Sequence, residues 1–258
     1  MKNFVAVSLS FFALPAVAIT NIESQRVKPI PEGLSGQIEF QFDGKSGNSE
    51  EEDYALSGRL NIKREQDLWF LIASHEYDKA NGNKDVDKSF AHGRWVHSYS
   101  PTWAGEAFIQ YQDNQFTRLL SRYLVGTGGR FTVLDESDKL NLAVGAGAFY
   151  VREREDLTTY ETNADYLRLN SYLSYKQQLN EHVSIISTAY YQPKASEFDD
   201  YNVLWNTSLI SKLNNSLKLK LAFNISHDSE APKNPEADPP VDIDSTDAEY
   251  SVSILYEF

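Results

Sequence analysis

One pair of residues has the types and spacing needed for nucleophilic catalysis: His227 and Ser229, in the stretch NISHDSEAP. An imidazole can take the proton of a serine hydroxyl and make it a nucleophile, provided that a third group holds the imidazole in the right tautomer. No acid or amide is evidently placed in the sequence to do this for His227. The pair therefore has two possible interpretations. It is either a hydrolytic site or the polar end of a strand that leads into a loop.

The other residue patterns that could carry chemistry are incomplete. The stretch GTGGR (126–130) looks like a phosphate-binding loop but lacks the Gly-Lys-Ser/Thr ending and a following helix. Asp242, Asp244 and Asp247 faintly resemble a calcium loop, yet its glycine and its bidentate glutamate are missing. Cysteine is absent, and the other histidines show no metal-ligand spacing: His75, His92, His97 and His182. The sequence thus predicts no cofactor and no metal site.

Composition limits the class of protein. The net charge is -13, whereas phosphate binding requires clustered Lys and Arg, so we expect no nucleic-acid partner. Residues 1–18 are typical of a cleaved secretory signal peptide, with Lys2, the apolar run FVAVSLSFFAL and the cleavage site Ala16-Val17-Ala18. This apolar run is too short to span a membrane as a helix. We expect a mature chain of residues 19–258.

Alternation of apolar and polar residues with a period of two is the main structural signal in the mature chain. It is clearest at 33–43, 53–63 and 216–226, where one face is apolar and the other polar, as in β-strands. Similar segments follow at 67–77, 88–98, 102–112, 118–133, 139–151, 165–176, 182–192, 201–211 and 247–258. Together these segments predict about twelve strands, and counts of ten or fourteen stay open.

The connections between these segments alternate in length. Short turns lie at 63–67, 98–102, 134–138, 176–181 and 212–216, and mostly longer loops lie between them. Short turns at one end and long loops at the other are typical of outer-membrane β-barrels. We therefore expect an all-β fold, a transmembrane antiparallel up-and-down barrel with a periplasmic tail at 19–32. A secreted soluble β protein is the alternative.

Aromatic residues make up 13% of the chain, which fits the aromatic girdles of such barrels. Seven of them lie near predicted strand ends: Trp69, Trp95, Tyr99, Trp103, Tyr191, Tyr201 and Trp205. The mean hydropathy of -0.47 also fits, because half of each strand would face a polar lumen.

Strand alternation predicts which charged side chains face the lumen: Glu39, Arg59, Arg94, Glu106, Arg122, Arg130, Arg168, Lys218, Lys220 and Glu249. These residues are either a salt-bridged filling of the barrel or the lining of a narrow pore that prefers anions. Two glycine pairs, Gly126 with Gly128 and Gly145 with Gly147, share the inward face of neighbouring strands. We expect Arg122 and Arg130 to fold over the space left by the first pair.

The final segment YSVSILYEF places Tyr250, Val252, Ile254, Tyr256 and Phe258 on one face. We interpret this face as the lipid-facing stripe of the closing strand. A terminal aromatic after alternating apolar residues resembles the assembly signal read by the outer-membrane insertion machinery. The expected partners are accordingly outer-membrane lipid and lipopolysaccharide, with the insertion machinery and periplasmic chaperones during biogenesis.

The run RLLSRYLVGTGGRFTVLDESDKLNLAVGAGAFYVRERED resembles the YdiY-type salt-induced outer-membrane proteins, a bacterial family of unknown function. The matching residues are glycines, aromatics and charges: Arg122, Gly126, Gly128, Gly145, Gly147, Tyr150 and Glu153, with a late loop at Asp238 to Pro240. The resemblance implies an outer-membrane location and a link to osmotic stress. It brings no known activity, cofactor or catalytic residue.

A second resemblance covers only the His-x-Ser pair, which outer-membrane phospholipases and lipid A deacylases carry on their lipid-facing side. The Asn-Gly expected next in the phospholipases is Glu230-Ala231 here. Our leading hypothesis is a non-enzymatic envelope protein of the Gram-negative outer membrane, either a structural barrel or a small solute pore linked to salt stress. The rivals are a lipid-hydrolysing enzyme using His227 and Ser229, and a binding module working through its acidic loops.

Overall fold

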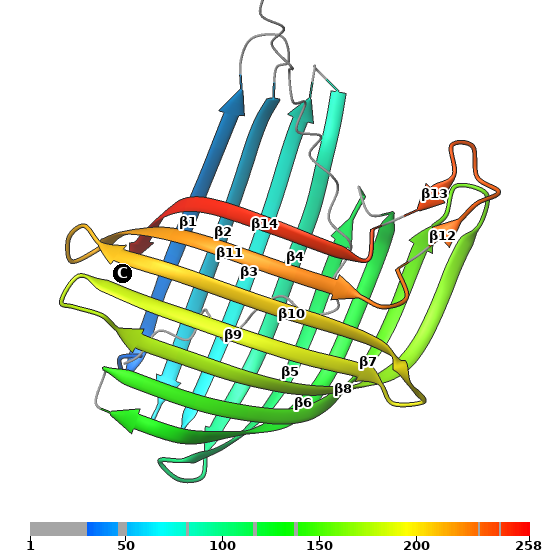
Figure 1. The fold of residues 1–258 in the computed structure, drawn as a ribbon. Helices are drawn as coiled ribbons and strands as arrows, with labels where there is room; N and C mark the ends of the chain where they lie inside the picture. The colour runs from blue at the N-terminus through cyan, green and yellow to red at the C-terminus, as the bar shows by residue number, and fades with distance from the viewer. Residues whose placement is uncertain are drawn as a thin grey trace, which may run out of the picture.

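Twelve antiparallel strands close into a barrel, as the alternation predicts (Figure 1). The computed structural model describes residues 30–45, 51–80, 83–115, 118–136, 139–231, 233–242 and 244–258. The strands of the barrel are β1 (Gly33–Lys45), β2 (Glu51–Arg64), β3 (Asp67–Ala80), β4 (Asn83–Ser98), β5 (Trp103–Asn114), β6 (Leu119–Glu136), β7 (Leu140–Asp156), β8 (Glu161–Gln178), β9 (Val183–Lys194), β10 (Glu197–Lys212), β11 (Leu217–Asp228) and β14 (Thr246–Glu257). The expected signal peptide and most of the expected tail lie outside the described residues.

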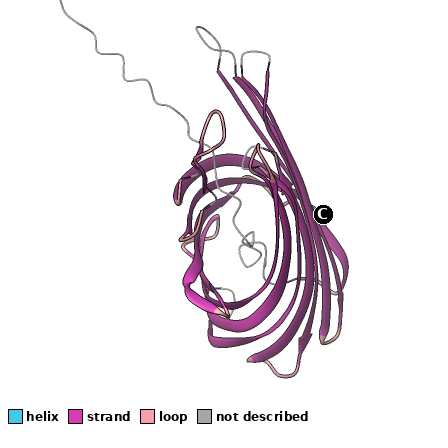
Figure 2. Cartoon of the chain, turned by 90° about the vertical axis from the view of Figure 1, so that its right-hand side faces the viewer, coloured by secondary structure: helices cyan, strands magenta, loops and turns pink. Residues whose placement is uncertain are grey.

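Each strand of the barrel pairs with its neighbour in the chain, and β1 pairs with β14 to close the ring around an oval cross-section (Figure 2). We call the end with the connections 65–66, 99–102, 179–182 and 213–216 the turn end, and the opposite end the loop end. The strands β1 to β4 run steeply in Figure 1, whereas β9, β10, β11 and β14 cross them on the opposite wall. Strand tilt of this kind is required to close a sheet into a barrel. Within the described part of the chain, no helix is long and apolar enough to cross a membrane.

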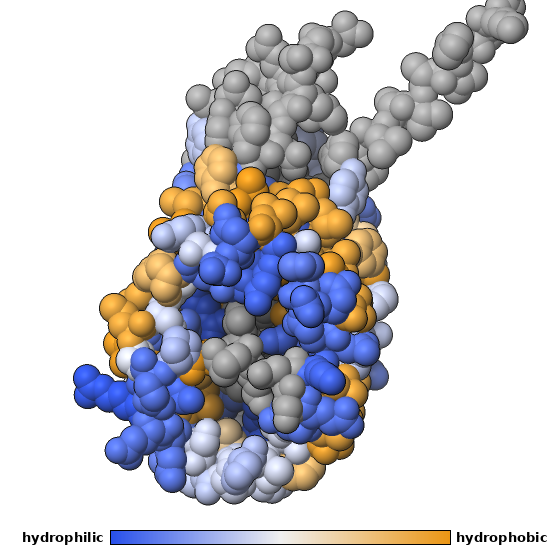
Figure 3. All heavy atoms as spheres, turned by 90° about the vertical axis from the view of Figure 1, so that its left-hand side faces the viewer, coloured by the Kyte–Doolittle hydropathy of each residue, from blue (hydrophilic) through white to orange (hydrophobic). Residues whose placement is uncertain are grey.

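The outer wall is apolar because alternate residues of each strand point outward. On β14, Tyr250 and Val252 are 71% and 51% exposed, while Ser253 on the opposite face is 2% exposed. The predicted outward stripe of Tyr250, Val252, Ile254, Tyr256 and Phe258 is exposed throughout. Figure 3 shows hydrophobic residues along the flanks and hydrophilic residues gathered around the middle of the face. So large an exposed apolar surface indicates a wall that faces an apolar environment.

Aromatic side chains form two rows on this outer wall. Trp69, Trp95 and Trp103 are exposed towards the turn end, where Trp69 pairs with Trp95 and Trp103 contacts Phe131. Towards the loop end, exposed or half-exposed tyrosines pack in pairs: Tyr111 with Tyr123, and Tyr191 with Tyr201. On β5 the eight residue-to-residue steps from Trp103 to Tyr111 span about 27 Å along the strand, which suits an apolar band of about 25 Å once the strand is tilted.

Trp205 does not belong to either row, contrary to our expectation that it lies near a strand end. It lies midway along β10, and its Nε1 donates to Ser187 Oγ at 3.0 Å. The hydroxyl of a neighbouring strand thus satisfies the indole within the apolar band, where a lone N–H would be costly.

The strands are longer at the loop end than the sequence predicts, and most of the expected long loops are strand. Only residues 157–160 separate β7 from β8, and only 195–196 separate β9 from β10. Cross-strand ion pairs accompany the extension on β7 and β8, namely Arg152 with Asp165 at 2.8 Å and Arg154 with Glu161 at 2.7 Å. Opposite charges on neighbouring strands stabilise strand pairing. They do so here in a stretch whose composition is typical of a polar loop.

The connection 229–245 is the long one, and it carries a two-stranded sheet of β12 (Lys233–Asn234) and β13 (Val241–Asp242). This segment packs on the β7–β8 turn. Asn234 Nδ2 donates to Leu157 O at 2.7 Å, and Leu157, Ala237 and Val241 bury one another. This connection, which the sequence predicts as a long loop, is therefore partly docked on the barrel rim.

Candidate functional site

The inner wall of the barrel holds nearly all of the charged residues that alternation assigns to the lumen. Glu39, Arg59, Arg94, Glu106, Arg122, Arg130, Arg168 and Lys218 are buried, and Lys220 and Glu249 are half-buried. Most of the basic members have an acidic partner at salt-bridge distance. At least five of the seven basic side chains pair with a carboxylate: Arg94, Arg122, Arg168, Lys218 and Lys220.

On one side of the barrel, from β4 to β10, side chains fill the interior. We call this the filled side. Its apolar members form one cluster: Phe108, Leu124, Phe149, Val151, Tyr172, Tyr190 and Leu204. Glycines make room for the rings, because a Cβ on Gly126 would lie 2.4 Å from Phe108 Cζ, and one on Gly145 would lie 2.1 Å from Tyr172 Cε1. The prediction that Arg122 and Arg130 cover Gly126 and Gly128 is wrong for Gly126, since aromatic rings take that space.

The buried ion pair of Arg94 and Glu106 anchors a hydrogen-bond chain on the filled side. Arg94 Nη1 donates to Glu106 Oε2 at 2.7 Å, and Arg94 Nε donates to His92 Nε2 at 3.2 Å. Because His92 Nε2 accepts, the proton of the neutral imidazole lies on Nδ1, which is 3.0 Å from Gln110 Oε1. Arg94 also lies over the Phe108 ring at 4.8 Å. This histidine therefore has a packing and hydrogen-bonding role.

Two further ion pairs close the filled side towards the loop end. Arg122 Nε donates to Glu153 Oε2 at 2.6 Å, and Tyr166 donates to the other oxygen of Glu153 at 2.8 Å. Arg168 Nη2 donates to Asp200 Oδ1 at 2.6 Å. Glu153 and Asp200 were missed as lumen-facing residues because they lie in stretches that we expected to be loops. Continuing the alternation of Phe149 and Val151 by one step would have found Glu153.

The opposite side, formed by β1, β2, β11 and β14, is polar. We call it the cavity side. Lys220 Nζ donates to both oxygens of Glu39, at 2.6 and 2.9 Å, and Ser253 Oγ donates to Glu39 Oε1 as well. Lys218 pairs with Glu257 closer to the turn end. The Glu39–Lys220–Ser253 cluster links three strands that are far apart in the sequence.

Two cavities lie against the cavity side, one above the other along the barrel. The cavity at the turn end has a volume of about 360 Å³, and its lining includes Gln37, Arg59 and Glu257. The cavity at the loop end has a volume of about 320 Å³, and its lining includes Glu39, Gln41 and Ser57. The boundary between them falls between Gln37 and Glu39 on β1, at the position of the Glu39–Lys220–Ser253 cluster.

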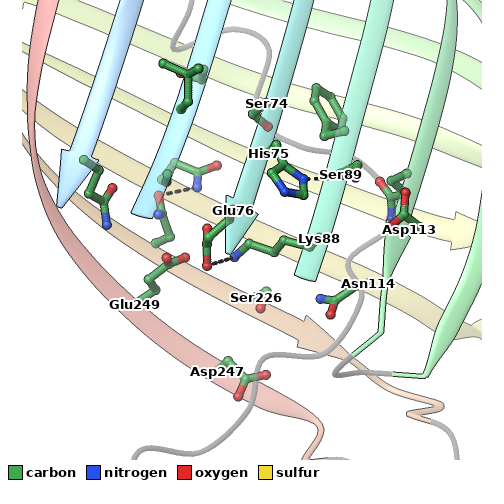
Figure 4. Close-up of a pocket in the computed structure, with 18 of the residues that line it drawn as sticks. Ser74, His75, Glu76, Lys88, Ser89, Asp113, Asn114, Ser226, Asp247 and Glu249 are labelled. Carbon is green, nitrogen blue, oxygen red and sulfur yellow. Dashed lines mark hydrogen bonds and ion pairs between the residues drawn. The ribbon is translucent and has the colours of Figure 1, made fainter. Parts of the chain in front are cut away.

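The loop-end cavity has a mainly polar lining drawn from several strands (Figure 4). Asp247 and Glu249 lie along β14, and Ser226 lies on the adjacent β11. Glu76 of β3 is paired with Lys88 of β4 at 2.7 Å. Among the described residues, no cluster of three or more His, Asp or Glu side chains is arranged to hold a metal ion.

The seam between β1 and β14 is short and lies beside this cavity. Residues 37–40 pair with residues 254–257, and two backbone bonds join Gly36 and Phe258. Among the described residues, 41–45 pair with β2 alone and 246–253 pair with β11 alone. Figure 1 shows β1 and β14 diverging from this seam. The wall is therefore split towards the loop end, next to Gln41 and Glu249.

His227 and Ser229 lie at the loop end of β11, but each has another partner. Ser229 Oγ donates to Asp199 O at 2.8 Å and accepts from Tyr201 N at 2.7 Å. His227 Nδ1 lies 2.7 Å from Thr246 Oγ1. Both described side chains are thus engaged in joining β11 to its neighbouring strands, and no hydrogen bond between the two is present.

Comparisons with known proteins give a family and a fold. A family model described as "Protein of unknown function, DUF481" matches residues 38–258. Among solved structures, the chain is similar to the translocator domain of the autotransporter NalP from Neisseria meningitidis, with 11% identity and a TM-score of 0.54 over 92% of each chain. It is also similar to the NanC porin, with 10% identity and a TM-score of 0.50 over 88% of this chain and 100% of that chain. These likenesses show a shared barrel fold. No curated protein matches the chain significantly.

Proposed function

The chain belongs to the DUF481 family, and we propose that it is a non-enzymatic barrel of the Gram-negative outer membrane that lets small hydrophilic solutes pass along its cavity side. The passage is closed at rest by the Glu39–Lys220–Ser253 cluster. The resemblance to the YdiY-type salt-induced proteins is confirmed at the level of the family, because these proteins are DUF481 members.

The proposed location rests on the outer wall. An apolar band bounded by two aromatic rows suits a barrel that spans a bilayer, since both interfaces favour amphipathic rings. The fold shared with the NalP translocator domain and the NanC porin supports the same location. Fractionation of cells that express the whole protein tests it, and recovery in the soluble fraction would count against it.

The proposed passage rests on one observation: two cavities on the same wall have linings that come close together on β1, next to the hydrogen-bonded Glu39–Lys220–Ser253 cluster. On β1 the linings of the two cavities are only two residues apart, at Gln37 and Glu39, which is about 7 Å along a strand. In the proposed opening, the Lys220 side chain moves away from Glu39 and the two cavities join. The filled side offers no such route through its described residues, because aromatic rings and buried ion pairs occupy it.

The anion preference expected from the basic lumen residues depends on free positive charge. At least five of those seven side chains have a carboxylate partner, and the loop-end cavity carries Asp247 and Glu249 besides. We therefore propose a weak preference for cations, as rings of acidic side chains confer in other pores. The reversal potential in a salt gradient tests this, and an anion-selective value would overturn it.

Planar bilayers test the passage directly. The double variant Glu39→Ser with Lys220→Ser removes both charges, so that neither is left buried without its partner. We expect single-channel conductance at least threefold above that of the unchanged protein. The matched control is Arg154→Gln, which breaks an exposed ion pair on the outer face and should leave conductance unchanged. No conductance in either the protein or its double variant would favour a purely structural barrel.

The non-enzymatic part of the proposal is supported by the hydrogen bonds of Ser229, which hold its hydroxyl on the backbone of β10. Hydrolysis of outer-membrane lipid by the purified protein, lost on Ser229→Ala, would contradict it. The link to salt stress rests on the family resemblance alone. The amount of protein in outer membranes from cells grown at low and high osmolarity tests that link, and equal amounts would remove it.

A further inference from the structure

The loop-end cavity contains two hydrogen-bond acceptors that the fold leaves unsatisfied. Asp247 is 7% exposed, and its Oδ2 has no hydrogen-bond partner. Asn206 Nδ2 donates to Asn224 Oδ1 at 2.6 Å, but the buried Oδ1 of Asn206 has no partner. Both residues line the cavity. Burying such acceptors without a donor is costly, so that a donor in the cavity would stabilise the fold.

The loop-end cavity also contains carboxylates that no positive charge of the described residues neutralises. Glu39 is neutralised by Lys220 and Glu76 by Lys88. Asp247 and Glu249, two positions apart on β14, have no ion-pair partner among the described residues. A buried carboxylate normally pairs with a positive charge. The Asp247 and Asn206 oxygens therefore lack a hydrogen-bond donor, and the carboxylates of Asp247 and Glu249 lack a positive partner among the described residues. An ammonium group supplies both.

We propose that the loop-end cavity binds a small soluble organic cation through a primary ammonium group, held by Asp247 and Glu249 with the Asn206 carbonyl as a further acceptor. Acceptor oxygens favour N–H donors, whereas a quaternary ammonium is recognised by a cage of aromatic faces. Phe90 is the one Phe, Tyr or Trp in the described lining. A volume of about 320 Å³ accommodates a linear diamine. The split between β1 and β14 provides a route from outside. Binding there does not require the proposed passage through the barrel.

Isothermal titration of the whole protein in detergent micelles with 1,4-diaminobutane tests the site. We expect saturable binding that weakens at least tenfold in Asp247→Asn and less in Glu249→Gln. The matched control is Glu230→Gln, which removes an exposed carboxylate from the connection 229–245 that precedes β14 and should leave affinity unchanged. Because Asp247→Asn is nearly isosteric, its heat-modifiable migration should match that of the unchanged protein and so report a folded barrel.

Three outcomes would overturn the site. One is the absence of diamine binding to the unchanged protein. Another is an equal loss of affinity in Asp247→Asn and Glu230→Gln, which would indicate a general effect of surface charge. The last is binding of tetramethylammonium or Ca²⁺ as tight as that of the diamine, since neither presents an N–H donor to the Asn206 carbonyl.

Discussion

The filled side and the cavity side of this barrel are built from the same strand alternation, yet their charged residues have different surroundings. On the filled side, the Arg94–Glu106 pair is enclosed by Phe108 and the hydrogen-bond chain of His92, and its side chains are 6% and 5% exposed. On the cavity side, Glu39 of the Glu39–Lys220 pair lines the loop-end cavity, and Glu249 has no ion-pair partner among the described residues. A lumen-facing charge thus has a packing role or a solute-facing role according to what its neighbours leave open.

The largest effect should come from breaking the ion pair of the filled side. Glu106→Gln leaves the buried charge of Arg94 without its carboxylate, and the loss of one partner of a buried pair costs about 3–5 kcal/mol. Denaturant unfolding in lipid vesicles measures this loss. The matched change on the cavity side is Glu249→Gln, which should leave the unfolding free energy unchanged. Equal losses in the two variants would remove the distinction between the two sides.

A smaller loss of stability is expected at Gly145, where the missing side chain leaves room for an aromatic ring. Gly145→Ala places a Cβ against the Tyr172 ring, and overpacking of this kind costs about 1–3 kcal/mol. Gly58 of β2 is the control, because a Cβ there has only Gln37 O nearby, at 4.0 Å. The temperature at which heat-modifiable migration is lost should fall for Gly145→Ala and stay constant for Gly58→Ala. A fall in the second variant alone would contradict the assignment of the filled side.

The smallest effect should come from the cluster that separates the cavities. Ser253→Ala removes one hydrogen bond to Glu39 and leaves both Lys220 contacts in place. We expect a loss of about 1 kcal/mol in unfolding free energy and conductance within twofold of the unchanged protein. Conductance as high as in the double variant Glu39→Ser with Lys220→Ser would mean that the serine, and not the ion pair, keeps the passage closed.

Local patterns were enough to predict the barrel, whereas they failed at the strand ends and at pairings across the lumen. Alternation assigned Arg94 and Glu106 to the inner face correctly, since side-chain direction along a strand has a fixed period of two. It missed Asp200, because Glu197–Lys212 begins in a polar stretch whose strand pairing comes from neighbouring strands. The docking of Asn234 on Leu157 joins residues 77 positions apart, and no local signal reports such a contact.

The sequence by itself determined that this chain forms an antiparallel barrel of about twelve strands with an apolar outer face, because period-two alternation and turn chemistry act over a few residues. Only the tertiary structure decided which lumen charges neutralise one another, where aromatic rings replace the expected arginines, and where cavities remain. These outcomes depend on the tilt of the strands and on which residues meet across the ring. Glu39 and Ser253 are 214 positions apart in the chain, and only the closing of β1 on β14 brings them together.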